Sequence, residues 1–247
     1  MSIINLSQNL LIEQIKRKAK KARGWENFES LIFPPMCGIC GKLNENYLCR
    51  RCYKRLEKDI DFKIENYVTE SGFRRKHFDE HIYFFKYQGL IREQIIDFKF
   101  NDEAYKYRAI SNFILKKFIL NDSKIYQTFN EYDLIIPVPV SKKRFKERGY
   151  NQAELIARPI ARFLEKPIET KCLYKSKNIT AQSTLNKEQR EENIKNVYTL
   201  KNKKILSNKK VLLVDDIYTT GSTANECCRV LAEANTSKIG VMTIAKD

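Results

Sequence analysis

One segment constrains this chain more than any other: an apolar stretch that runs into two acidic residues and then into a turn rich in hydroxyl groups. Residues 211–214 are all valine or leucine, which is typical of a buried strand. Asp215 and Asp216 follow directly, and residues 219–223 lead into the helical pattern of residues 224–233. This order of strand, turn and helix predicts a mostly parallel sheet flanked by helices, with the turn at the carboxyl end of a strand.

The residues of this segment suit a phosphorylated sugar. Two adjacent carboxylates at the carboxyl end of a strand can accept hydrogen bonds from a vicinal diol. The turn supplies backbone N–H groups, three threonine hydroxyls, one serine hydroxyl and the start of a helix, which together suit a phosphate group. Gly221 allows the backbone to approach the ligand closely. An unused loop at the end of a strand is the alternative interpretation.

The complete pattern resembles the ribose-5-phosphate loop of type I phosphoribosyltransferases, in which a hydrophobic strand, paired acids and a run such as Thr-Thr-Gly-Ser-Thr recur. The resemblance implies a type I phosphoribosyltransferase fold that binds phosphoribosyl pyrophosphate (PRPP). Asp215 and Asp216 would hold the ribose 2′- and 3′-hydroxyls. Donor binding in this family also involves Mg²⁺, so the resemblance implies Mg²⁺ together with PRPP. The 5′-phosphate would be held by Thr219, Thr220, Gly221, Ser222 and Thr223.

A second segment fits the same architecture. A predicted strand at residues 134–138 ends in a cationic turn that contains Ser141, Lys142, Lys143 and Arg144. Three consecutive cations suit a pyrophosphate group, and a loop at this place binds the pyrophosphate of the donor in the family that the chain resembles. A solvated basic turn is the alternative interpretation.

A polar segment at residues 175–193 lies where type I phosphoribosyltransferases carry a flexible loop that closes over the bound donor. The resemblance implies that Gln182, Lys187 and Arg190 reach the pyrophosphate when the loop closes. Lysine and asparagine dominate the segment, so a solvated linker is the alternative interpretation.

Four cysteines have the spacing of a metal site. Cys37 and Cys40 form one CxxC pair, and Cys49 and Cys52 form a second pair after eight intervening residues. Four thiolates on two tight turns suit a tetrahedral Zn²⁺ ion, and a site closed by four protein ligands is structural rather than catalytic. Two redox-active dithiols are the alternative, but the strand and helix context of a thioredoxin-like motif is missing.

Cations surround the second cysteine pair, so a contact with a phosphate backbone is a hypothesis for this part of the chain. These cations are Arg50, Arg51, Lys54 and Arg55. The remaining thiols are expected to be buried or without a role, and the two histidines are expected to be structural. They are Cys172, Cys227, Cys228, His77 and His81.

Three further patterns narrow the resemblance to the ComF family of competence-associated proteins. They are the CxxC pairs after Phe-Pro-Pro, the run Arg-Gly-Tyr-Asn-Gln-Ala at residues 148–153, and the spaced residues Thr180, Gln182, Leu185, Arg190 and Asn193. ComF proteins resemble a zinc module fused to a phosphoribosyltransferase domain, and they act on incoming single-stranded DNA in naturally transformable bacteria. The resemblance therefore implies that this chain binds both single-stranded DNA and PRPP.

Strand and helix patterns alternate from residue 81 onward, which supports an α/β fold. We expect a basic helical leader at residues 1–30, a four-cysteine zinc module at 31–60 and a phosphoribosyltransferase-like domain at 61–247. Strands are predicted at residues 81–87, 134–138, 211–214 and 238–244. Helices are predicted at residues 90–100, 105–120, 151–164 and 224–233.

The charge of the chain suits a polyanionic partner. Lys and Arg outnumber Asp and Glu by 46 to 30, which gives a formal net charge of +16 at pH 7. A lysine-rich solvated surface is the alternative. Aromatic side chains are available for stacking on bases, although alternation at residues 81–87 favours a core position for about half of them. They are Phe73, Tyr83, Phe84 and Tyr87.

The sequence predicts a cytoplasmic protein, because it contains no apolar stretch long enough for a transmembrane segment and its start lacks the pattern of a signal peptide. Other competence proteins at the inner face of the membrane are candidate partners. Two further functions stay open at this point: an active phosphoribosyltransferase of nucleotide metabolism with an unknown acceptor, and a regulator that senses PRPP without catalysis.

Overall fold

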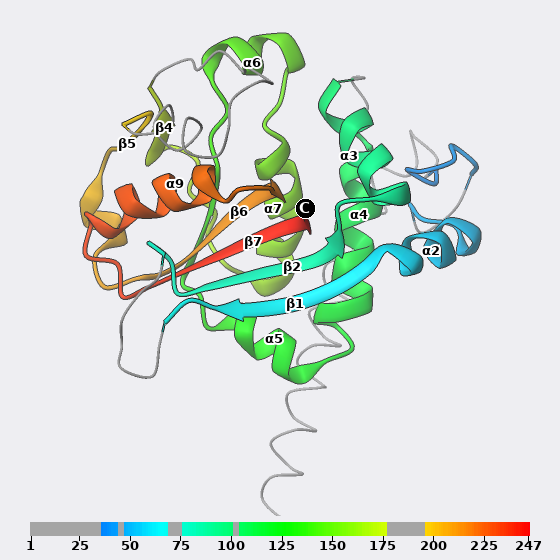
Figure 1. Cartoon of the computed structure of the whole chain (residues 1–247), viewed down its shortest axis with the longest axis horizontal. Helices are drawn as coiled ribbons and strands as arrows, with labels where there is room; N and C mark the ends of the chain where they lie inside the picture. Colours follow the sequence, from blue (N-terminus) through cyan, green and yellow to red (C-terminus); the bar gives the residue numbers. More distant parts are fainter. Residues whose placement is uncertain (1–35, 44–46, 69–75, 101–103, 177–195) are drawn as a thin grey trace, which may run out of the picture.

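The computed structural model describes residues 36–43, 47–68, 76–100, 104–176 and 196–247. Its centre is a five-stranded sheet with the order β1-β2-β7-β6-β3 (Figure 1). β1 is antiparallel to β2, and all other neighbours are parallel, which confirms the predicted mostly parallel sheet. The strands are β1 (Ile60–Asn66), β2 (Glu80–Lys86), β3 (Leu134–Pro137), β6 (Lys210–Tyr218) and β7 (Lys238–Lys246).

Helices cover both faces of the sheet (Figure 1). One face packs against α3 (Gly89–Phe100), α4 (Lys106–Ile114), α5 (Ser123–Asn130) and α7 (Gln152–Leu164). The other face packs against α9 (Ser222–Ala232) and a separate hairpin of β4 (Leu173–Lys175) and β5 (Tyr198–Leu200). Shorter elements are α2 (Arg50–Leu56), η1 (Glu57–Asp59), the π turn η2 (Leu115–Ile119), α6 (Lys142–Arg148) and η3 (Lys203–Leu206).

Side chains along β6 alternate between the two faces, as the period of a strand requires. Leu212 and Val214 belong to the apolar cluster shared with α3, α4 and α7, whereas Val211 and Leu213 belong to the cluster shared with α9. The same alternation turns the two acids that follow, Asp215 and Asp216, toward opposite faces. The face that each acid meets therefore depends on the register of β6.

Most of the predicted elements are confirmed, and two of them differ in extent. The helix predicted at residues 105–120 is α-helical only to Ile114 and continues as the π turn η2. The sequence did not predict this change, because apolar spacing alone does not separate the two helix types. β6 runs to Tyr218, so Asp215 and Asp216 lie inside the strand rather than after it. The pairing of β6 with β7 accounts for the extra length, because it continues beyond both acids.

The segment that carries the four cysteines packs directly against the helices of the sheet domain. A Cβ atom added at Gly38 would lie 2.8 Å from the Cβ of Ala109 in α4. The ring of Tyr53 in α2 lies 4.7 Å from that of Phe113, and Leu56 is fully buried in the same cluster. The four-cysteine segment and the sheet domain therefore share apolar packing.

Within the described ranges, no helix combines the length and the apolar character needed to cross a bilayer.

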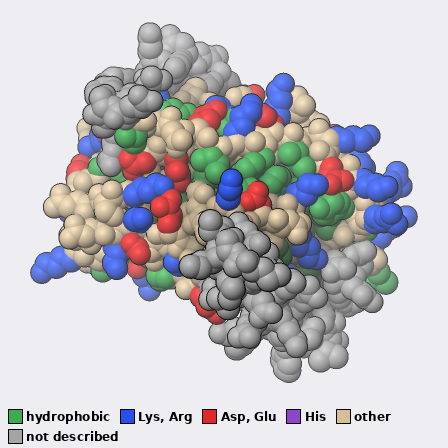
Figure 2. Space-filling view, turned by 90° about the horizontal axis from the view of Figure 1, so that it is seen from below, with side chains coloured by type: hydrophobic (Ala, Val, Ile, Leu, Met, Phe, Trp, Pro, Cys, Tyr) green, Lys and Arg blue, Asp and Glu red, His purple; other side chains and the backbone are tan. Residues whose placement is uncertain are grey.

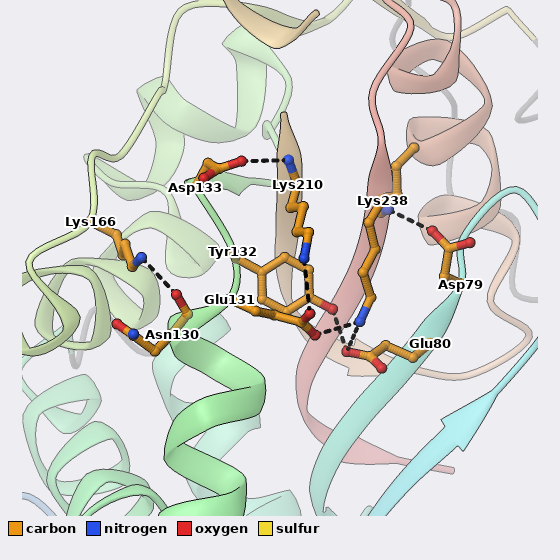
Figure 3. Close-up of polar contacts among 10 residues, drawn as sticks. Asp79, Glu80, Asn130, Glu131, Tyr132, Asp133, Lys166, Lys210 and Lys238 are labelled. Carbon is orange, nitrogen blue, oxygen red and sulfur yellow. Dashed lines mark hydrogen bonds and ion pairs between the residues drawn. The ribbon is translucent and has the colours of Figure 1, made fainter. Parts of the chain in front are cut away.

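A network of polar groups ties the amino-terminal ends of the parallel strands together (Figure 3). Tyr132 donates a hydrogen bond to Glu80, and Lys238 forms ion pairs with both Glu80 and Glu131. Lys210 also pairs with Glu131, at 3.4 Å. The close approach of Tyr132 requires glycine at position 240, because a Cβ atom there would lie 1.9 Å from the tyrosine hydroxyl oxygen. This network connects the segment before β3 to β2, β6 and β7.

Removal of the Tyr132 hydroxyl should destabilise the protein, because the buried Glu80 carboxylate loses a donor. We expect Tyr132→Phe to lower the free energy of unfolding by about 1–3 kcal/mol in urea denaturation. Tyr174→Phe, at an exposed position of β4, is the matched control and should change it by less than about 0.5 kcal/mol. Equal unfolding midpoints for wild type and Tyr132→Phe would show that Lys238 alone satisfies Glu80.

Candidate functional site

Asp215 and Asp216 lie at the point along β6 where the pairing with β3 has ended and the pairing with β7 continues. β3 ends at Pro137, which pairs with Val214, and the N–H of Val138 then donates to the carbonyl of Val214 at 2.8 Å. β7 remains paired through Asp215 and on to Tyr218. Past Val214, β6 therefore borders a cleft on its β3 side, with a volume of about 340 Å³.

The cleft brings together residues from both segments that the sequence singled out. Predicted residues among its lining are Ser141, Arg144, Asp215, Asp216, Thr219 and Thr223. Thr220, Gly221 and Ser222 form the turn beside it without lining it, and Lys142 and Lys143 are exposed outside it. The predicted loop residues Gln182, Lys187 and Arg190 lie outside the described residues.

Other lining residues were not predicted as site residues. Arg148, Asn151 and Gln152 belong to the Arg-Gly-Tyr-Asn-Gln-Ala run, which signalled a family resemblance without indicating a role. Lys99 and Tyr198 come from α3 and β5, and no motif marks them. Lys175 ends β4 and is the first residue of the polar segment predicted as a flexible loop. Only the folded arrangement places these side chains beside the acids.

The turn after β6 has the geometry expected of a phosphate-binding loop at a helix start. Gly221 has a φ of 75° and forms the N-cap of α9, and a Cβ atom at this position would lie 2.1 Å from the hydroxyl oxygen of Tyr218. The hydroxyls of Thr220 and Ser222 lie 2.7 Å apart. The first N–H groups of a helix have no acceptor inside the helix, so this turn presents both hydroxyl and backbone donors.

The predicted cationic turn is largely helical. Ser141 caps α6 by accepting a hydrogen bond from the N–H of Arg144 at 3.3 Å, so residues 142–144 form the first turn of a helix rather than an irregular loop. Ser141, Arg144 and Arg148 are spaced by three and four residues and so share one helix face, which lines the cleft. Helical spacing therefore explains why Arg144 reaches the cleft while its two neighbours do not.

The charges in the cleft influence one another strongly. Burial, followed by the proximity of Asp216, raises the pKa of Asp215 from 3.8 to about 7, although Lys99 opposes this rise. Lys99 Nζ lies 2.9 Å from Asp216 Oδ2. Burial and then the nearby Arg144 lower the pKa of Lys175. These surroundings therefore favour the protonated form of Asp215 more than water does.

The four cysteines predicted to bind a metal converge on one point. All four Sγ atoms lie within 4.8 Å of one another, and those of Cys40 and Cys49 are 3.8 Å apart. Tetrahedral Zn²⁺ with Zn–S bonds of about 2.3 Å requires sulfur atoms roughly 3.8 Å apart. The donor set and its spacing therefore fit a metal ion, consistent with structural zinc.

Backbone donors favour a negative charge on one thiol of this cluster, that of Cys37. Burial raises the pKa of the Cys37 thiol, but N–H groups of Cys49, Cys40 and Ile39 outweigh it and lower that pKa to about 7. Gly41, with a φ of 70°, closes the turn by donating its N–H to the carbonyl of Cys37 at 2.9 Å. The turn thus favours a thiolate, which is the form that binds metal.

The cations proposed to contact DNA beside this cluster are exposed on α2. They are Arg50, Arg51, Lys54 and Arg55. Of the aromatic residues considered for stacking, Tyr83 and Phe84 are buried in the core and are closed to bases, whereas Tyr87 is half-buried. Phe73 and the leader at residues 1–30 lie outside the described residues.

The remaining thiols are buried, as the sequence predicted, whereas the two histidines differ in exposure. Cys172, Cys227 and Cys228 are buried, and burial raises the pKa of each thiol. His81 is buried, and its Nε2 lies 2.9 Å from the hydroxyl oxygen of Thr243. The backbone N–H of His77 donates to Asn225.

The cysteine cluster yields a direct prediction about metal content. The purified protein should contain about one Zn²⁺ per chain by elemental analysis, as expected for a closed site of four thiolates. Cys40→Ser should lose most of this zinc because it removes one ligand. Cys172→Ala, which deletes a buried thiol away from the cluster, should retain it. Wild-type protein without zinc, or equal loss in both variants, would contradict the assignment.

Comparisons with known proteins agree with this geometry. The family model for the phosphoribosyl transferase domain matches residues 150–247. The chain is 28% identical to Competence protein F of Haemophilus influenzae over 216 residues. This aligned region covers 86% of this chain and 85% of that protein. It is 30% identical over 150 residues to Competence protein ComFC of Bacillus subtilis, covering 60% and 56%. DNA utilization protein YhgH of Shigella flexneri is 28% identical over 114 residues, covering 46% and 49%.

The domain match includes the acid pair, the turn and α9, and the similarity to Competence protein F extends along most of both chains. The sheet, its flanking helices and the four-cysteine cluster have the organisation that the sequence predicts. The relatives and the domain match together support a ComF-family protein with a phosphoribosyltransferase-type domain.

Proposed function

We propose that this chain binds PRPP in the cleft and single-stranded DNA on its basic surface, and that it handles incoming DNA during natural transformation. The observation that carries the proposal is the cleft itself. Its lining combines the adjacent acids Asp215 and Asp216 with the turn that starts α9 and with cations from three other elements. A ligand with a vicinal diol between two anionic groups matches this combination.

Each part of PRPP has a counterpart in the cleft. The 5′-phosphate would accept hydrogen bonds from Thr219, Thr223 and the amino-terminal end of α9. The ribose hydroxyls would donate to Asp215 and Asp216. The pyrophosphate would lie near Arg144, and Mg²⁺ bound with the donor would spread its charge.

DNA binding is supported by charge and by the relatives. The net charge of +16 provides attraction to a phosphate backbone, and α2 presents four exposed cations beside the cysteine cluster. Two of the similar proteins carry competence in their names and a third carries DNA utilization. A cytoplasmic location, with other competence proteins at the inner face of the membrane as partners, fits this role.

PRPP binding should depend on pH through Asp215. The pKa of this carboxyl is raised to about 7, and its ionised form accepts hydrogen bonds from ribose hydroxyls much more strongly than its protonated form. Lowering the pH from about 8 to about 6 should therefore weaken binding about tenfold in isothermal titration calorimetry. Ionisation of the ligand phosphates contributes separately, and the residual binding of Asp215→Asn measures that contribution. Identical pH profiles for wild type and Asp215→Asn would contradict the role of this residue.

The two proposed binding activities should be separable by mutation. Asp215→Asn combined with Asp216→Asn should abolish detectable PRPP binding and retain zinc, because the cysteine cluster lies outside the cleft. Single-stranded DNA binding by this variant should stay within about threefold of wild type. Loss of PRPP, zinc and DNA binding together would indicate a global defect and would contradict independent sites.

DNA binding should show the salt dependence of phosphate contacts. If α2 contacts about four phosphates, raising salt from about 50 to about 200 mM should weaken binding of labelled single-stranded DNA roughly fiftyfold in fluorescence anisotropy. Arg51→Ala combined with Arg55→Ala should weaken binding at low salt and reduce the salt slope. Lys203→Ala combined with Lys204→Ala, which removes two exposed cations from η3, is the charge-matched control. No binding at low salt would refute the DNA-handling role.

A further inference from the structure

Lys99 forms an ion pair with Asp216, one of the two acids in the cleft. Its Nζ atom lies 2.9 Å from Oδ2 of Asp216, and the two side chains are only 22% and 11% exposed. Lys99 is near the carboxyl end of α3, a position at which the helix dipole favours a cation. α3 precedes residues 150–247, to which the phosphoribosyl transferase domain model matches. The chain thus supplies this contact from outside the matched segment.

Asp216 has cationic neighbours from two elements of the cleft. Asp216 meets Lys99 of α3, whereas Asp215 lies near Cys227 of α9, in keeping with their alternation along β6. Burial and the nearby Arg144 lower the pKa of Arg148, and Asp216 opposes this effect. Lys99 and Arg148 therefore lie near Asp216, and Arg144 lies near Arg148. The cations that line the cleft outnumber its acids, and this excess of positive charge suits an anion.

A buried donor near the start of α7 points to the same kind of ligand. Gln152 lines the cleft and is 2% exposed. Its Nε2 atom has no hydrogen-bond partner among the residues that the structure describes. Leaving a buried amide donor unsatisfied is costly, so an oxygen of a bound ligand is a suitable acceptor.

Lys99 competes with any ligand that forms a hydrogen bond with the Asp216 carboxylate. A ribose hydroxyl that donates to this carboxylate must share it with Lys99 or displace the ammonium group. Displacing a cation in an enclosed site is unfavourable unless it gains another anion. A ligand that carries a diol next to a pyrophosphate supplies such an anion, whereas a sugar without the pyrophosphate does not.

We infer that Lys99 is a binding residue of the donor site. When the ligand binds, the ammonium group of Lys99 leaves Asp216 and pairs with the pyrophosphate of the ligand. This inference rests on the proposed binding of PRPP and deepens it. The exchange makes the cleft selective for a ribose that bears an anionic group beside its diol. It also explains why the chain places a lysine against an acid that is otherwise needed for sugar binding.

The test compares three ligands in isothermal titration calorimetry of the full chain. They are PRPP with Mg²⁺, inorganic pyrophosphate with Mg²⁺, and ribose 5-phosphate. Lys99→Met should weaken binding of PRPP and of inorganic pyrophosphate by about tenfold each, because both lose a charged contact. Binding of ribose 5-phosphate should change by less than about threefold, since the freed Asp216 compensates for the lost charge.

Two further variants identify the cause of the effect. Lys124→Met removes the same charge from an exposed position of α5 and should leave all three affinities within about twofold. Lys99→Arg keeps the charge and should bind PRPP within about threefold of wild type. Circular dichroism and thermal unfolding of each variant confirm that the fold is retained.

The outcomes separate this inference from the proposed function. If wild type does not bind PRPP, the proposed function fails. If wild type binds PRPP and Lys99→Met binds it equally well, only the role of Lys99 is overturned. An equal loss for all three ligands also overturns it, because Lys99 would then merely hold Asp216 in position. If Lys99→Met does not fold, Lys99→Arg provides the test. The inference is then overturned if this variant loses as much affinity for ribose 5-phosphate as it loses for pyrophosphate.

Discussion

The early end of β3 beside the longer β6 is the constraint on which the site depends. Pro137 is the last paired residue of β3, and Pro139 cannot donate a hydrogen bond to continue the ladder. β6 nevertheless continues to Tyr218, because β7 holds its other edge. The backbone of Asp215 and Asp216 is therefore fixed on one side and faces open space on the other. A longer β3 would fill the cleft.

The two ends of the sheet use charge in opposite ways. At the amino-terminal ends, Lys238 is matched by Glu80 and Glu131, and the hydroxyl of Tyr132 completes the network. At the carboxyl ends, the cleft is lined by more cations than acids. Matched charges connect secondary-structure elements, whereas an excess of one sign in a partly enclosed site favours a ligand of the opposite sign. This asymmetry agrees with the location of ligand sites in parallel sheets.

The predicted site segments whose residues the structure brings together are local ones. The acids, the turn and α9 follow one another along the chain, so their arrangement depends on one strand, one glycine and one helix start. The cysteine cluster is similar, because two short turns bring each pair together. The cationic segment was only partly predicted. Its residues were expected to form a loop, but they form the first turn of α6. With 3.6 residues per turn, Arg144 lines the cleft, whereas Lys142 and Lys143 lie outside it.

The sequence by itself determined the fold class, the acid pair with the turn that follows it, and the four-cysteine cluster, because each of these depends on spacing within a short segment. Only the tertiary structure decided that Lys99 pairs with Asp216, that Gln152 and Lys175 line the same cleft, and that Tyr83 and Phe84 are core residues. These contacts join elements that are distant in sequence. They arise from strand order and from the packing of α3 and α7 on one face of the sheet, and neither leaves a periodic signal in a single sequence.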